Sequence, residues 1–381
     1  MKIASIETFL VPPRWLFCRV ETDDGLVGWG EPVIEGRART VQAAVHELEH
    51  ILLGRDPLSI EDSWQVMTKG TFYRGGPILS SAIAGIDQAL WDMAGKFHGV
   101  PVYDLLGGPV RDKVRIYGWV GGDRPNELSD AIQAQVDAGL TAIKMNACAQ
   151  MDPIATLADI RAVVARAEAA RTVLGPDRDL AIDFHGRVTR ANARKLLRAL
   201  EPVAPMFVEE PLVPEETAFL GELADASVIP LATGERLFRR ADFLPALQAG
   251  AAVVQPDLSH AGGISECRRI AILAETFGAH LAPHCPLGPI ALAACLQVDF
   301  ATPNFLIQEQ SLGIHYNEDA DLLDYVVDSG VFQFDEGYLA RPAGPGLGVD
   351  IDESAVREAA KIEHDWRSPV WRHRDGSFAE W

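Results

Sequence analysis

The chain has 381 residues, 48% of them hydrophobic, and carries a net charge of −20 at pH 7. This length and apolar content favour one large α/β domain with an accessory domain. So acidic a surface repels nucleic acid, and an anionic substrate would need a local cation, either Lys/Arg or a bound metal. No apolar run is long enough to span a bilayer, and the first residues lack the apolar region of a signal peptide.

The five cysteines are scattered and show no CxxC spacing. That pattern argues against a disulfide framework and against a structural zinc site. We therefore expect a cytoplasmic protein with no membrane partner and no nucleic-acid partner.

The first part of the chain has the pattern of a small α+β domain. Residues 1–13 and 16–32 alternate like antiparallel strands, and the second stretch contains the turn signal Asp24-Gly25. Helical periodicity follows at residues 40–52, 60–72 and 80–99. Strands followed by helices predict a capping domain over residues 1–112.

From residue 113 short apolar strands alternate with amphipathic helices. The eight predicted strands lie at residues 114–120, 141–147, 180–186, 205–211, 229–235, 251–257, 279–285 and 305–311. Their continuous apolar character is typical of parallel strands buried on both faces, and eight such units indicate a (β/α) barrel. We expect the barrel over residues 113–313. The turn-rich and aromatic residues 314–381 are expected to pack back on the capping domain.

Titratable residues stand at the carboxyl ends of successive predicted strands. They are separated by 22 to 27 residues, about one βα unit each: Asp183, Glu209, Glu235, Asp257, His284 and Glu309. Active sites of such barrels lie at this face, so the set predicts one shared site.

Three of these residues are carboxylates that would converge at the barrel mouth. Asp183 and His185 are two residues apart, so on a strand both side chains would point the same way. Clustered carboxylates repel one another unless they share a cation, and oxygen ligands favour Mg²⁺. The sequence therefore predicts a magnesium site built from Asp183, Glu209 and Glu235.

Two further interpretations concern His284 and Lys144. Asp257, one strand earlier, can hold the tautomer of His284 and raise its basicity, which predicts a catalytic base. Lys144 would suit a Schiff-base aldolase, but a carboxylate-rich mouth favours a protonated lysine that grips an anion. Cys285 is assigned to packing. His315, just past the eighth strand, is a candidate for substrate contact, and His46, His50, His98, His260 and His280 are assigned no role.

The ordered motifs carry a family resemblance over essentially the whole chain. They are Lys-x-Asn on the second strand, then "DFHGR", "VEEP", "GER", "QPDLSHAGGI", "APHCPLGPIA" and "QEQ". In this order they resemble the mandelate racemase subgroup of the enolase superfamily. The resemblance implies a modified TIM barrel of (β/α)7β type, with an N-terminal α+β capping domain that the C-terminal segment completes.

The resemblance also implies an activity, that of a Mg²⁺-dependent sugar-acid dehydratase acting on an aldonic acid in a homo-oligomer. It implies that Asp183, Glu209 and Glu235 bind Mg²⁺, which holds the substrate carboxylate, and that Lys144 helps to neutralise that carboxylate.

The remaining implied roles concern proton transfer. His284, paired with Asp257, would remove the proton next to the carboxylate, while Glu309 hydrogen-bonds the developing enolate. His185 would act as the acid that helps the 3-hydroxyl to leave as water. Racemases of this subgroup carry a second lysine where this chain has Asn146. That difference disfavours two-base racemisation, although epimerisation with His185 as the second base stays open.

Selectivity is expected to come from two cap loops, residues 11–17 and 68–77, with Arg14 or Arg74 meeting substrate hydroxyls. Three rival functions stay open: a dehydratase or epimerase of another aldonate, a non-catalytic sugar-acid sensor, and a Schiff-base aldolase using Lys144.

Overall fold

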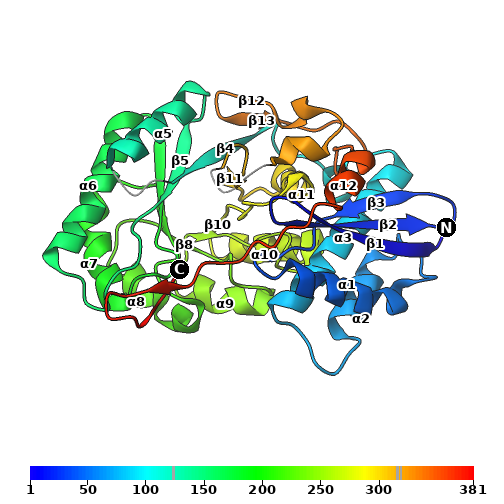
Figure 1. The fold of residues 1–381 in the computed structure, drawn as a ribbon, viewed down its shortest axis with the longest axis horizontal. Helices are drawn as coiled ribbons and strands as arrows, with labels where there is room; N and C mark the ends of the chain where they lie inside the picture. Colours follow the sequence, from blue (N-terminus) through cyan, green and yellow to red (C-terminus); the bar gives the residue numbers. More distant parts are fainter. Residues whose placement is uncertain (122–124, 315–316, 318–319) are drawn as a thin grey trace.

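The computed structural model describes residues 1–121, 125–314, 317 and 320–381. Figure 1 shows a three-stranded sheet with its helices at one end of the molecule and a barrel at the other. Within the described residues, no helix is both long and apolar enough to cross a membrane.

The N-terminal domain is an antiparallel sheet covered by helices. Its strands are β1 (Ile3–Val11), β2 (Trp15–Thr22) and β3 (Val27–Gly30), and its helices are α1 (Ala38–Leu52), α2 (Ile60–Lys69), α3 (Pro77–His98) and α4 (Val102–Leu105). Helix α3 is buried along most of its length. Glycines let α3 approach the sheet, since a Cβ on Gly30 would lie only 1.8 Å from the carbonyl oxygen of Gly85.

The predicted barrel is confirmed, with all eight strands present. They are β4 (Lys113–Val120), β5 (Ala142–Asn146), β6 (Asp179–Asp183), β7 (Phe207–Glu209), β8 (Leu231–Thr233), β9 (Val253–Val254), β10 (His280–Leu281) and β11 (Gln308–Glu309). Each pairs in parallel with the next from β4 to β10, and β11 pairs with β4. A bridge between Leu281 and Phe305 completes the circle.

The barrel interior contains a cluster of buried side chains of mixed size. Its members come from the strands or from the residues next to them: Tyr117, Ala142, Ala181, Phe207, Ala232, Val253, Ala282 and Ile307. The barrel is therefore a packed core and not a pore.

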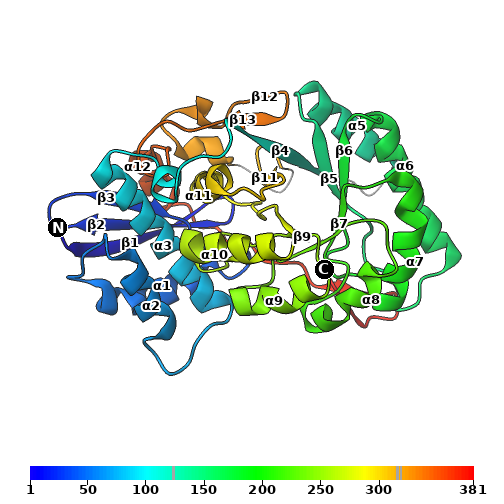
Figure 2. The ribbon, with the colours of Figure 1, turned by 180° about the vertical axis from the view of Figure 1, so that it is seen from behind.

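Helices cover the outside of the barrel, as the views from both sides show (Figures 1 and 2). They are α5 (Pro125–Asp137), α6 (Leu157–Leu174), α7 (Arg190–Leu200), α8 (Leu220–Ala224), α9 (Arg240–Gln248), α10 (Gly263–Thr276) and α11 (Pro289–Ala301), with 3-10 turns η1 (Glu201–Val203) and η2 (Pro214–Phe219).

The strands end earlier than the apolar runs predict. β8, β9 and β10 end at Thr233, Val254 and Leu281. Glu235, Asp257 and His284 therefore lie in the loops that follow the strands, where the chain is free of the alternation that strand pairing imposes. The prediction that these residues end the strands is wrong by two or three positions.

The C-terminal segment divides between the capping domain and the barrel. It contains η3 (Leu322–Tyr325), η4 (Ser329–Phe332), β12 (Phe334–Asp335), β13 (Tyr338–Ala340), α12 (Glu353–Ala359), β14 (Trp371–Arg372) and β15 (Phe378–Ala379). Strand β13 pairs with β4. On the cap side, Arg19 meets Glu353 at 3.2 Å and Arg357 meets Glu7 at 3.1 Å.

Candidate active site

Lys144 stands at the centre of a buried charge cluster at the carboxyl end of β5. Its Nζ lies 2.8 Å from Glu209 Oε1, 2.8 Å from Glu309 Oε1 and 4.0 Å from Asp183 Oδ2. Burial lowers the pKa of Lys144, but the charges of Glu209 and Glu309 outweigh it and hold that pKa well above its ordinary value. The side chain is therefore an ammonium at neutral pH, which makes it a poor Schiff-base nucleophile.

Asp183, His185 and Glu235 form a second group beside this lysine. One possible ligand atom from each lies within 4.8 Å of the others. Asp183 Oδ2 is 2.7 Å from His185 Nε2, and Glu235 Oε2, though buried, has no hydrogen-bond partner among the described residues. A buried carboxylate oxygen without a donor is costly, so this donor set fits a hard cation.

Glu209 has different surroundings. It lies opposite Asp183 in the β6–β7 pairing, but its Oε1 meets Lys144 and its Oε2 accepts a hydrogen bond of 2.7 Å from Gln255 Nε2. Burial raises the pKa of Glu209 well above its ordinary value, against the lowering effect of Lys144. A cation bound by Glu209 would remove this cost. Glu209 and Asp183 both lie near Lys144, whereas the group of possible ligand atoms within 4.8 Å of one another contains Asp183, His185 and Glu235 without Glu209.

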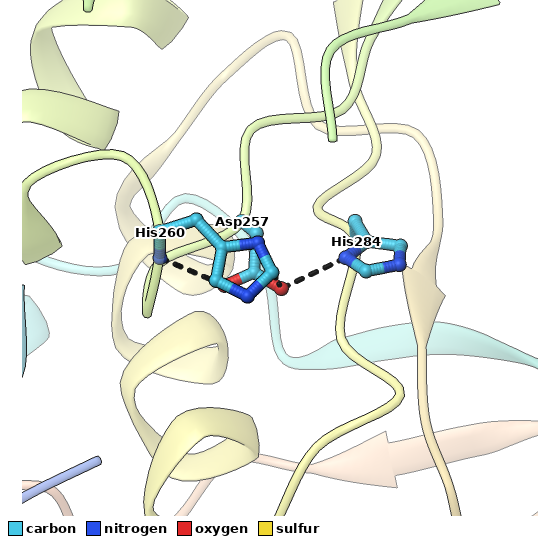
Figure 3. A group of neighbouring side chains, drawn as sticks. All are labelled: Asp257, His260 and His284. Atoms are coloured by element: carbon cyan, nitrogen blue, oxygen red, sulfur yellow. Dashed lines mark hydrogen bonds and ion pairs between the residues drawn. The ribbon is translucent and has the colours of Figure 1, made fainter. Parts of the chain in front are cut away.

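Asp257 lies between His284 and His260, as Figure 3 shows. His284 Nδ1 is 2.8 Å from Asp257 Oδ2, while Asp257 Oδ1 accepts from the backbone of Ser259 and His260 at 2.6 and 3.1 Å. On its other side, His284 Nε2 lies 3.6 Å from Glu235 Oε2 and faces the carboxylates. The carboxylate thus orients the imidazole toward the cluster.

His260, to which the sequence analysis assigned no role, packs against this pair. Its ring centroid is 6.0 Å from that of His284, and its Nε2 is 3.5 Å from Glu35 Oε2 in the capping domain. Glu35 in turn lies 4.0 Å from Arg14. A chain of charges therefore runs from the barrel into the cap. His260 belongs to the motif "QPDLSHAGGI", whose helix-like spacing gave no sign of this contact.

His185 lies beyond the end of β6 in a tight turn, with a φ of 51°. The strand-based reason for expecting it beside Asp183 is therefore wrong, although the two side chains do meet. The turn is held by a hydrogen bond of 2.7 Å from His185 N to Asp183 Oδ1. Residues other than glycine adopt such a φ only where their surroundings hold it. Behind the ring, Arg187 Nη2 donates to His185 Nδ1 at 2.8 Å.

A cavity of about 690 Å³ unites these side chains. Arg14 and Asn146 line it as predicted, and Asn146 Oδ1 is buried without a hydrogen-bond partner in the described parts of the chain. Arg14 also donates to the carbonyl oxygen of Pro286 at 2.8 Å. Arg74 is exposed and is not part of the lining, and His315 lies outside the described residues.

The outer wall of the cavity comes from the end of the chain. Trp366, Trp371 and Trp381 line it together with His185 and His284. Arg14 lies over the ring of Trp366 at 5.2 Å and Arg187 over the ring of Trp371 at 4.6 Å. Tryptophans in a C-terminal tail carry no sequence signal for this place, because Arg14 and Trp366 stand near opposite ends of the chain.

Fold and site together are those of an enolase-like barrel with its cap, and the chain belongs to the mandelate racemase/muconate lactonizing enzyme family. Residues 8–107 match the N-terminal domain of that family, and residues 127–355 match the enolase C-terminal domain-like family.

Particular relatives are similar over their full length. D-galactonate dehydratases from Ralstonia pickettii and Pectobacterium atrosepticum are 56% and 53% identical, with all of both chains covered. Among solved structures, an enolase from Agrobacterium radiobacter, described as a candidate galactarate dehydratase and bound to Na and L-malate, is 35% identical. It superposes with a TM-score of 0.91 over all of both chains.

Proposed function

We propose that this protein is a Mg²⁺-dependent D-galactonate dehydratase, which converts D-galactonate to 2-dehydro-3-deoxy-D-galactonate and water. The observation that carries the proposal is the pair of imidazoles in one cavity, which reach the same carboxylate cluster through Asp183 and Glu235. The identity of 53 to 56% to D-galactonate dehydratases supports the choice of substrate. The related structure that holds Na and L-malate supports the binding of a cation and of a hydroxy acid.

The cation would be held by Asp183, Glu209 and Glu235. When bound, it supplies the fixed positive charge that makes removal of a proton next to a carboxylate accessible. Lys144, held as an ammonium by Glu209 and Glu309, adds a second positive charge for the substrate carboxylate.

His284 would remove the C2 proton through Nε2, because its Nδ1 is occupied by Asp257. Glu309, which accepts a hydrogen bond of 2.9 Å from Cys285 N, would hydrogen-bond the developing enolate, and it can donate that bond only in its protonated form. His185 would then protonate the 3-hydroxyl, which leaves as water. The resulting enol tautomerises to the 2-keto-3-deoxy acid.

Asn146 and Arg14, which line the cavity, would contact substrate hydroxyls, and His315 is proposed as a further contact. We also propose three parts for the chain: the cap (1–112), the barrel (113–313) and the C-terminal segment (314–381). A cytoplasmic homo-oligomer is the proposed working form. The five free cysteines suit a reducing compartment, and size-exclusion chromatography with light scattering tests the assembly.

The test is a panel of aldonic acids incubated with purified protein and Mg²⁺, with 2-keto-3-deoxy acid as the readout. We expect turnover of D-galactonate that a chelator and His284→Asn both abolish. If only another aldonate is turned over, that acid replaces D-galactonate as the proposed substrate. If the acid is epimerised and no keto product forms, epimerisation replaces dehydration as the proposed reaction. Binding without any turnover would favour a sensor.

A further inference from the structure

The two imidazoles of the cavity meet opposite partners at Nδ1. His284 Nδ1 lies 2.8 Å from a carboxylate oxygen of Asp257, and His185 Nδ1 lies 2.8 Å from Nη2 of Arg187. A carboxylate accepts hydrogen bonds, whereas a guanidinium has five donors and no acceptor. In its neutral form the first ring therefore carries its proton on Nδ1 and presents a lone pair at Nε2.

His185 is held the other way round. Because Arg187 can only donate, Nδ1 of His185 must accept, and in the neutral ring the proton sits on Nε2. On the far side of the ring, Nε2 lies 2.7 Å from Asp183 Oδ2, but the two atoms form no hydrogen bond. The contact with Arg187 therefore selects the tautomer, and it leaves the N–H on the cavity side of the ring.

Arg187 has little freedom to leave this position. Its side chain is only 8% exposed. Nη1 donates to the carbonyl oxygen of Cys148 at 2.8 Å, and the ring of Trp371 covers the guanidinium at 4.6 Å. The turn also fixes the backbone from which the side chain extends, because Arg187 N donates to Phe184 O at 2.8 Å. Cys148 and Trp371 therefore hold the guanidinium against the ring nitrogen, while the turn holds the Arg187 backbone.

We propose that Arg187 is a positioning residue that keeps His185 a proton donor at Nε2 and so makes it the acid of the dehydration. The inference rests on the proposed function. Both residues are histidines that line the same cavity, and their different Nδ1 partners give them opposite roles in proton transfer. When Nε2 gives its proton to the 3-hydroxyl, which leaves as water, the guanidinium at Nδ1 offsets the negative charge that remains on the ring. Without Arg187, Nδ1 becomes free to hold the proton, and Nε2 then faces the leaving hydroxyl with a lone pair that cannot donate.

The first test reads the tautomer directly and needs no turnover. Protein labelled with nitrogen-15 in histidine gives imidazole signals that separate N–H from bare nitrogen, and the His185→Gln variant assigns the signals of that ring. With Mg²⁺ present, we expect the Nε2–H form of His185 in the unaltered protein. We expect Arg187→Met to lose it and Arg187→Lys to keep part of it. An unchanged tautomer in Arg187→Met would overturn the proposal.

The second test separates the two proton transfers. In D₂O, removal and return of the C2 proton places deuterium in recovered D-galactonate, while dehydration yields the keto acid. In Arg187→Met we expect dehydration to fall by roughly 100-fold or more, because general acid catalysis contributes that much. Exchange at C2 should stay within about threefold of its rate in His185→Gln, since both variants lack only the acid.

Two control variants show whether C2 exchange and dehydration respond separately. His284→Asn should lose exchange and dehydration together, and Arg187→Lys should recover part of the dehydration. Parallel loss of both reactions in Arg187→Met would mean a merely structural role and would overturn the inference. If the unaltered protein dehydrates no aldonic acid, the proposed function fails. The tautomer measurement then still decides whether Arg187 sets the proton position.

Discussion

Asp87, in the middle of cap helix α3, accepts two hydrogen bonds from Ser265, the third residue of barrel helix α10. Ser265 Oγ is 2.6 Å from Asp87 Oδ1, and Ser265 N is 3.0 Å from Oδ2. A cap carboxyl thus covers the N-terminus of a barrel helix. Glu31 repeats this arrangement at α11, where it accepts from Gly288 N and Ala291 N at 2.7 and 2.9 Å. These contacts fix the cap over the barrel mouth.

The Asp87 contact predicts a pH-dependent stability. Burial raises the pKa of Asp87 to about 7, from an ordinary value of 3.8. The folded protein therefore holds this proton more tightly than the unfolded chain does. The resulting stabilisation is complete at pH values below the pKa of Asp87 in the unfolded chain. It is lost as the pH rises through the pKa of Asp87 in the folded protein. We expect the advantage of the unaltered protein over Asp87→Asn to shrink between about pH 5 and pH 8, measured by urea unfolding. Asp177→Asn, at an exposed position, is the control, and a constant difference for Asp87→Asn would refute the prediction.

Metal removal should act through Glu235. Glu235 is one of the proposed ligands, and its buried Oε2 has no hydrogen-bond donor in the described parts of the chain, so Glu235→Gln removes a charged oxygen from the site. We expect the variant to lose Mg²⁺ affinity at least about tenfold and to gain less in melting temperature from Mg²⁺ than the unaltered protein does. Calorimetric titration and thermal melting with and without Mg²⁺ measure both effects. Glu222→Gln, an exposed substitution, is the control, and an unchanged Mg²⁺-induced shift for Glu235→Gln would remove this residue from the site.

Lys144 should matter for stability as well as for substrate. Lys144→Met leaves Glu209 and Glu309 buried without their common partner. Breaking one side of a buried ion pair costs about 3–5 kcal/mol, so the free energy of unfolding should fall by that order. Urea unfolding in chelator measures it, with the exposed Lys69→Met as control. A loss below about 1 kcal/mol would show that water already screens the cluster.

Removal of residues 366–381 should change the affinity for substrate and have little effect on the stability of the fold. Among residues 366–381, only Ala379 is buried, so a chain that ends at residue 365 should melt close to the full chain. Its cavity would lack Trp366, Trp371 and Trp381. We expect KM for D-galactonate to rise more than kcat falls, because binding surface is lost while His284 and Asp257 stay in place. Unchanged KM would mean that the tryptophans do not meet the substrate.

The barrel could be predicted because its signals are local. Each strand is a short apolar run, and the spacing of 22 to 27 residues from Asp183 to Glu309 repeats one βα unit. The capping domain could be predicted for the same reason, from alternation followed by helical periodicity. Strand ends could not be predicted, because hydrogen bonding between neighbouring strands decides where Thr233 or Leu281 stops pairing, and apolar character continues past that point.

The candidate site was predictable only in its innermost part. The residues beyond the strand ends converge because the barrel brings successive loops together. His260, Glu35 and Trp371 reach the site through contacts between distant segments, for which periodicity and spacing give no signal. Arg187 is close in sequence to the predicted site residue His185, but only the left-handed turn at His185 brings its guanidinium to the ring nitrogen.

The position of the tail has a consequence for how the protein is made. Residues 366–381 follow every barrel strand in the chain, so a ribosome adds the tryptophan wall after the carboxylates and both histidines have been synthesised. A nascent barrel can therefore fold around its charge cluster while its mouth is still open. An exposed stretch lies between Trp366 and Trp371, and Val370 within it is 68% accessible. A single proteolytic cut there would separate Trp371 and Trp381 from the rest of the chain after folding, and the finished substrate pocket would then be incomplete.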